Sequence, residues 1–240
     1  MADTAPPPLD KVDPATAWQP WQPSDKDPWS LKWAGHLYRR AGFGANLVEL
    51  RQAVKAGHAA TLERVLQGEL RGDEAEARHD FLDDLGAKIA RQNNAYQLRG
   101  WWLYAILHSP HSLREKMTLF WHNHFVSSVA KVARAPLMFR QNRLLREHAL
   151  GKLGPFVLAV SKDPAMIVYL DNNSNVKGKP NENYARELME LFTLGVGNYT
   201  EQDIRQAARA FTGWHTDDDK FEFNARYHDN GEKTVFGMTG

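Results

Sequence analysis

Two short segments carry most of the side chains that could do chemistry. WHNHF contains His122 and His124, and NENYARELMEL contains Arg186, Glu187 and Glu190. Imidazole nitrogens and carboxylate oxygens bind divalent metals and act as general acids and bases. We therefore predict a catalytic set of Glu187, Glu190, His124 and Arg186. The predicted ligands of a divalent metal cofactor are His122, His124, Glu187 and Glu190.

The two histidines point apart if their segment is helical. At 100° per residue, a helix through LREKMTLFWHNHF places His124 within a broad apolar arc and His122 on the opposite side, beside Glu115. Such a pair cannot chelate one ion. The alternative for His124 is a core imidazole bonded to a backbone carbonyl or a neighbouring side chain. The alternative for His122 is a polar contact with Glu115.

The acidic pair lies on a predicted amphipathic helix from Pro180 to Leu194, ended by Gly195. Its apolar arc is made of Tyr184, Ala185, Leu188, Met189, Leu191 and Phe192. Glu187 and Glu190 are three residues apart, so they are neighbours and repel unless a cation lies between them. Arg186 is the nearest cation in sequence. A solvated or arginine-paired acidic face is the alternative to a site.

A second charged region surrounds the helical pattern FRQNRLLREHAL. Arg140, Arg143 and Arg146, with Lys131 and Arg134 before them, could hold an anionic group. The alternative is an ion-pair network, with Glu147 paired to Arg143 at i, i+4. No phosphate-binding glycine loop, nucleophile elbow or H-E-x-x-H motif is present.

Composition narrows the classes of function. The 240 residues have a formal net charge of +1 and no cysteine, which excludes disulfides, thiolate metal sites and cysteine nucleophiles. A near-neutral chain offers no global field for nucleic acid, so we predict no nucleic-acid partner. We also predict no membrane span. No signal peptide is recognisable, so as written we expect a cytoplasmic chain.

The predicted fold is mainly α, an irregular multi-helix bundle over residues 31–215 with a C-terminal β-hairpin over 216–240. Capping boxes are predicted at Asn46/Glu49 and Ser112/Glu115, and Thr200 with Asp203 opens the last helix. Alternation over 221–227, the turn DNG and the returning KTVF predict the hairpin, which we expect to continue into a missing C-terminal part. Residues 1–30 are a Pro/Trp-rich tether, disordered or docked through Trp18, Trp21 and Trp29.

Three runs in order, HLYRRAGFG, LREKMTLFWHNHF and NENYARELMELFTLGVGNYTEQDIRQAARAFTGW, resemble a bacterial family known as domain of unknown function 1800. The resemblance covers about Ala34 to Gly240. It implies an N-terminal portion of a longer protein, because family members are usually about twice this length. It also implies frequent export and a sulfatase-like partner protein encoded nearby. It implies no particular reaction.

Two functions follow as hypotheses. The first is a metal-assisted or acid/base enzyme, hydrolase-like, acting on an anionic or polymeric substrate held by an arginine such as Arg186 or Arg143. The second is a non-catalytic helical scaffold that binds a partner protein or a cell-surface polymer. The two differ in whether the His122/His124 segment meets the Glu187/Glu190 pair in a cleft.

Overall fold

The computed structural model describes residues 11–17, 19–68, 70 and 72–240 and is mainly helical, as predicted. Its helices in the first half are α1 (Pro14–Ala17), α2 (Leu31–Ala41), α3 (Leu47–Ala56), α4 (His58–Gln67), α5 (Asp73–Arg91), α6 (Ala95–His108) and α7 (Ser112–His124). The second half contains α8 (Val129–Val132), α9 (Ala135–His148), α10 (Leu153–Ser161), α11 (Pro164–Tyr169), the short η2 (Asn172–Ser174), α12 (Asn183–Glu187), η3 (Leu188–Thr193) and α13 (Glu201–Ala210). The strands are β1 (Trp214–Asp217), β2 (Lys220–Phe223), β3 (Thr234–Val235) and β4 (Met238–Thr239).

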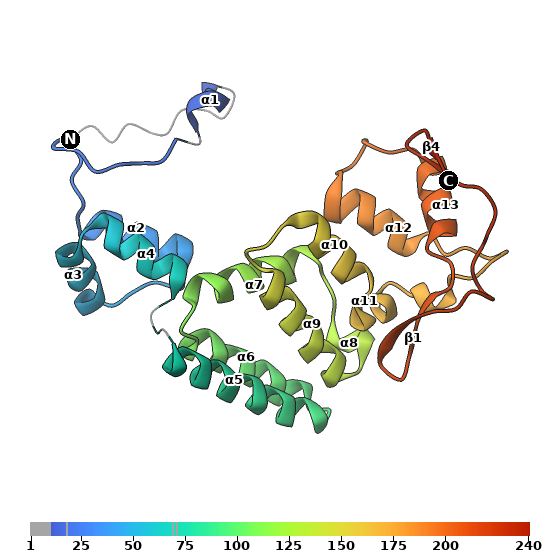
Figure 1. Ribbon diagram of the computed structural model, residues 1–240, viewed down its shortest axis with the longest axis horizontal. Helices are drawn as coiled ribbons and strands as arrows, with labels where there is room; N and C mark the ends of the chain where they lie inside the picture. The colour runs from blue at the N-terminus through green and yellow to red at the C-terminus, as the bar shows by residue number, and fades with distance from the viewer. Residues whose placement is uncertain (1–10, 18, 69, 71) are drawn as a thin grey trace.

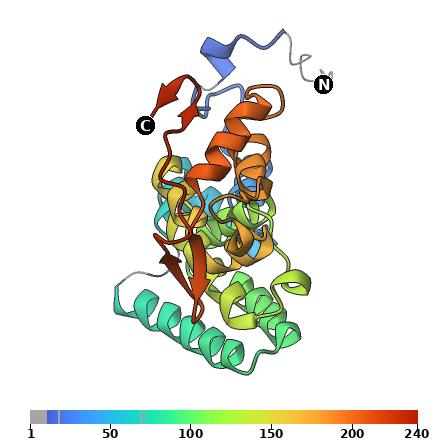
Figure 2. The ribbon, with the colours of Figure 1, turned by 90° about the vertical axis from the view of Figure 1, so that its right-hand side faces the viewer.

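The helices form an elongated, irregular assembly (Figure 1). Helices α2 to α4 lie at one end, and α12 and α13 lie with the strands at the other. Between them, α7 packs on α9, and the pair α5–α6 packs on α9 from below. Figure 2, viewed from the strand end, shows the β1–β2 hairpin in front of the helices. Helix α9 is therefore the central element that the other layers share.

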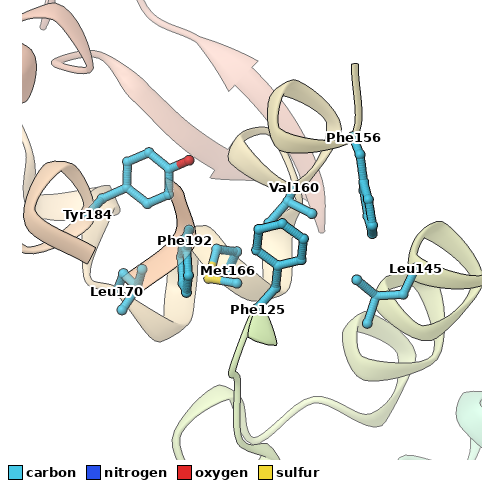
Figure 3. Packing of buried hydrophobic residues seen from close by; sticks show 8 residues of the cluster. All are labelled: Phe125, Leu145, Phe156, Val160, Met166, Leu170, Tyr184 and Phe192. Atoms are coloured by element: carbon cyan, nitrogen blue, oxygen red, sulfur yellow. The ribbon is translucent and has the colours of Figure 1, made fainter. Parts of the chain in front are cut away.

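The main core surrounds α9 to η3 (Figure 3). Phe125 meets Phe156 and Phe192 edge to face there, with ring centroids 5.0 and 5.3 Å apart. A second core holds α5 and α6 against α9, and in it the Trp101 indole donates to the Leu82 carbonyl at 2.7 Å. These two cores fix the relative positions of α6, α7 and α9.

Local helix signals were confirmed where they need only neighbouring residues. Both halves of the capping box form at Asn46/Glu49 and at Thr200/Asp203. The predicted box at Ser112/Glu115 is wrong, because Ser112 already lies inside α7 and His111 is the N-cap. Glu115 instead accepts hydrogen bonds from Arg146 on α9. A long-range ion pair has therefore replaced the local cap.

The helix predicted from Pro180 to Leu194 begins three residues later and changes form. Residue Asn181 remains in the preceding loop, where its backbone N–H donates to the Asn175 side chain at 2.9 Å. From Leu188 the helix is a π-helix, which uses i→i+5 bonds. This wider turn carries Leu191, predicted on the apolar arc, to the surface, where it is 58% exposed.

The β-hairpin is present, but the predicted pairing of its strands is wrong. Strand β2 pairs with β1, which precedes it, through a two-residue turn at Asp218 and Asp219. Both turn residues have positive φ, as a tight hairpin requires. The segment KTVF instead contributes β3, which pairs with β4. The alternation after Phe223 was misleading because residues 225–227 form a turn.

The N-terminal tether docks in its described part. Trp21 stacks on Trp33 with ring centroids 4.6 Å apart, and both indoles donate to Asp27. Trp29 donates to the Ala53 carbonyl of α3 at 3.1 Å. Trp18 lies outside the described residues. In the described part of the chain, no helix combines the length and apolar character needed to cross a membrane.

Candidate functional site

The WHNHF segment is helical, and its two histidines face different neighbours. His124 packs against Phe125 and Phe192, and its Nε2 lies 3.0 Å from the Phe192 carbonyl oxygen. A carbonyl can only accept, so Nε2 carries the proton and only Nδ1 is left with a free lone pair. This is the core arrangement that the sequence offers as the alternative for His124. His122 faces α6 instead.

The predicted catalytic arginine and one glutamate are held by partners. Arg186 donates to both carboxylate oxygens of Glu201, at 2.9 and 2.8 Å, and to Glu182 at 3.2 Å. Glu190 accepts a 2.7 Å hydrogen bond from the Tyr199 hydroxyl. These contacts match the arginine-paired acidic face. Neither group is free to bind an anion or transfer a proton without first breaking them.

Glu187, which the sequence predicts as a catalytic residue and metal ligand, lines a groove. The groove, about 380 Å³, lies between α8, α11 and the α12–η3 helix, with Lys131, Tyr169 and Asn183 among its walls. Partial burial and the neighbouring Glu190 charge raise the pKa of Glu187. Lys131 lies 2.6 Å from Asp171, which compensates its charge. The groove therefore exposes one carboxyl group that is easier to protonate than usual.

The predicted metal ligands do not gather into one cluster. Over the residues that the structure describes, no three His, Asp or Glu side chains are placed to hold a single metal ion. His122 lines a pocket beside α6, whereas Glu187 lines the groove beside α11. The divalent metal therefore stays a prediction from residue types, without a converging ligand set.

Apart from Arg140, the basic residues on and before α9 form separate ion pairs. Arg143 pairs with Asp83 of α5 at 3.2 Å rather than with Glu147, so that predicted pair is wrong. Arg140 donates to the Asp219 carbonyl of the hairpin turn at 2.6 Å. Arg146 donates to both oxygens of buried Glu115, at 2.7 and 3.1 Å. The ion-pair network, rather than an anion site, describes these arginines.

A pocket of about 220 Å³ lies where α6, α7, α8 and α9 meet, and His122 is part of its wall. The His122 ring contacts Trp102 edge to face, with centroids 4.9 Å apart. Burial lowers the pKa of His122, so the ring is neutral at pH 7. The rest of the wall is Ala95, Leu98, Arg99, Trp101, Trp102, Ser127, Ser128, Val129, Met138, Phe139 and Asn142.

Two side chains of this wall carry a buried polar atom without a hydrogen-bond partner. They are Trp102, whose indole Nε1 is a donor, and Asn142, whose Oδ1 is an acceptor. Asn142 is only 7% exposed. Leaving such an atom unpaired costs about 1–3 kcal/mol, so native proteins rarely keep it without a reason. A bound ligand that offers a complementary donor and acceptor is such a reason, provided that the wall side chains covering the two atoms shift when it binds.

A buried chain of hydrogen bonds supports the pocket from behind. The hydroxyl group of Ser127 donates to Gln141 Oε1, and Gln141 Nε2 donates to Asp163 at 2.7 Å. Asp163 also caps α11 by accepting from the Met166 N–H at 2.9 Å. Burial raises the pKa of Asp163 to about 7. Because its proton is donated to Gln141, the Ser127 oxygen remains an acceptor toward the pocket.

Comparison with known proteins agrees with the motif resemblance. Residues 36–240 match the model of a family described as "Protein of unknown function (DUF1800)". The chain belongs to this family. Neither the curated proteins nor the solved structures that were searched contain a match. The geometry of this DUF1800 chain is therefore the basis for the proposals about its function.

Sequence reasoning found one residue of the DUF1800 pocket, His122, and missed the rest. Trp102 and Asn142 lie 40 residues apart on α6 and α9, and neither belongs to a recognisable motif. One available signal was the pair Trp101–Trp102, because adjacent residues of a helix cannot both occupy the centre of one core face. Trp101 takes the core position, which turns Trp102 toward His122.

Proposed function

We propose that this chain is a non-catalytic helical binding module, and that the pocket lined by Trp102, His122 and Asn142 holds its ligand. The observation that carries the proposal is the pair of orphaned polar atoms on the walls of one pocket. Supporting it, Arg186 and Glu190 of the predicted catalytic set are held in hydrogen bonds. The ligand is one unit of a partner protein or polymer, or a small molecule of that size.

Ligand-observed NMR of the full chain with benzoate and benzyl alcohol as probes tests this proposal. We expect at least one probe to bind, and binding to be lost in Ala95→Trp, which fills the pocket. The matched control is Ala56→Trp at the exposed end of α3, which adds the same side chain away from the pocket. If neither probe binds, or if Ala95→Trp still binds with unchanged helicity, the proposal is wrong.

The role of Asn142 gives a second test. If Asn142 serves ligand binding, its unpaired Oδ1 lowers the free energy of unfolding of the free protein. Asn142→Leu removes that atom at similar volume. We expect the free energy of unfolding to rise by about 1 kcal/mol while probe binding weakens. A fall in stability would assign Asn142 a structural role instead.

Acid–base catalysis is a second candidate function, favoured by the raised pKa of Glu187 in the groove. Hydrolysis of p-nitrophenyl acetate and p-nitrophenyl glycosides by the full chain would test it. This function predicts turnover that is lost in Glu187→Gln and kept in Glu190→Gln with both folds intact. Absence of turnover on the whole panel, or equal loss in both variants, would count against Glu187 as the acid.

A further inference from the structure

The hydrogen-bonding groups of the His122 pocket comprise three donor groups and three acceptor groups. Trp102 has a free indole N–H, and Arg99 adds a guanidinium group with five N–H bonds. Ser128 accepts from the Ala130 N–H at 3.2 Å, which leaves its own hydroxyl proton available to donate. The acceptors are Asn142 Oδ1, the Ser127 oxygen and one nitrogen of His122. The wall therefore suits a ligand that offers acceptors to Arg99 and Trp102 and a donor to Asn142.

The wall of the His122 pocket carries a positive charge and no negative charge. Arg99 is exposed at the mouth, and within the described residues it makes no ion pair. No acidic side chain lines the pocket. Burial is the cause of the lowered pKa of His122, with no contribution from a neighbouring charge. A negatively charged group would meet one unpaired cation and no repelling carboxylate.

The remaining walls fix the size and nature of the rest of the ligand. Leu98, Trp101, Val129, Met138 and Phe139 make most of the lining apolar. A volume of about 220 Å³ equals the share of roughly seven waters in the liquid, below the range of pockets for drug-sized molecules. One ring with two short substituents fills such a space.

We infer that the pocket takes a small organic anion, a carboxylate carried on a compact ring that also bears a hydroxyl group. Arg99 and the Trp102 N–H bind the carboxylate, the hydroxyl group donates to Asn142 Oδ1, and Met138 and Phe139 contact the ring. This inference rests on the proposed binding function, since it names the ligand class of the same pocket. The carboxylate can belong to a free acid or to the end unit of a longer chain, because the mouth beside Arg99 is exposed.

Isothermal titration of the full chain with benzoate, benzamide and benzyl alcohol tests the ligand class, because benzoate is negatively charged and the other two are neutral at nearly constant shape. We expect benzoate to bind at least tenfold more tightly than benzamide, as a charge-assisted hydrogen bond implies. Arg99→Gln should abolish this preference while leaving benzamide binding unchanged. The matched control is Arg91→Gln, an exposed arginine of α5 outside the pocket, which should keep the preference.

An NMR titration of the His122 ring gives a readout independent of affinity. Benzoate should raise the pKa of His122, because a nearby negative charge favours the imidazolium form, and benzamide should not. Equal binding of benzamide and benzoate would overturn the anion inference and leave the binding module standing. If none of the three probes binds, both the inference and the proposed function fail.

Discussion

Glu115 and Arg146 form a buried ion pair that joins α7 to α9, with side chains 3% and 11% exposed. Removing one partner leaves the other charge uncompensated, so Arg146→Met should lower the free energy of unfolding by about 3–5 kcal/mol. Urea denaturation followed by circular dichroism measures this change. Replacing both residues, as Arg146→Met with Glu115→Leu, should recover most of the loss, since no lone charge remains.

Arg186→Met is the matched control for that prediction. Arg186 also donates to both oxygens of one carboxylate, but Glu201 is 60% exposed and water already screens the charges. We expect a loss below about 1 kcal/mol. Equal losses for the two arginines would show that burial does not decide the strength of these pairs.

Asp163 should make stability depend on pH in a definite direction. Its pKa is about 7 in the folded chain, against an ordinary value of 3.8, so the folded state binds the extra proton between these values. Stability therefore falls as pH rises from about 4 to 7, by a few kcal/mol at about 1.4 kcal/mol per pKa unit. Asp163→Asn keeps an acceptor for Met166 and Gln141 and should remove this fall.

Urea denaturation of wild type and Asp163→Asn at several pH values between 4 and 8 isolates that contribution. Other titrating groups, such as His122, act in both proteins and cancel in the difference. His122 works in the opposite direction, because its lowered pKa costs stability as pH falls. A constant difference between the two proteins across the range would contradict the raised pKa of Asp163.

At the scale of elements, Gly86 sets how closely α5 approaches its neighbours. A Cβ added there would lie 2.4 Å from the Phe139 ring and 2.5 Å from the Trp101 ring. Helix propensity alone favours Ala over Gly by about 1 kcal/mol. Because both rings are fixed in the core, we expect Gly86→Ala to lower the free energy of unfolding by at least 1 kcal/mol net.

Gly100 on α6 is the control, since nothing lies within 4 Å of an added Cβ. There the propensity term acts alone, and Gly100→Ala should raise stability by about 0.5–1 kcal/mol in thermal or urea unfolding. The two substitutions should thus have opposite signs. Stabilisation by Gly86→Ala would show that α5 can move away from Phe139 and Trp101 at little cost.

Element boundaries were predictable where a few neighbouring residues decide them. The cap at Asn46 and the stop at Gly57 follow from side chains and φ values within one turn. The sequence prediction missed the π-helix from Leu188, because it used the α-helical period of 3.6 residues per turn for the whole segment. The hairpin is present, but its strand pairing was mispredicted because β1, with the sequence WHTD, lacks the alternation of apolar and polar residues expected of a strand.

At the scale of the molecule, the fold class was predictable and the pocket was not. Helical periodicity follows from the order of residues along the chain, whereas the pocket depends on how α6, α7 and α9 cross in space. Glu115 shows the difference, because its local partner was Ser112 and its actual partner lies 31 residues away. Residue types could therefore nominate His122, but only packing could place it beside Trp102 and Asn142.

The elongated shape predicts unequal stability along the chain. The core around α9 to η3 contains eight buried side chains, three of them phenylalanines, whereas the core of α2 to α4 contains Ala34, Tyr38, Ala53 and Val65. Less apolar burial gives a smaller free energy of local opening. Native-state hydrogen exchange should therefore find the amides of α2 to α4 opening before those of α9 and α10. Trp29→Ala, which breaks the bond to Ala53, should widen this difference, and uniform protection across all helices would show one cooperative unit instead.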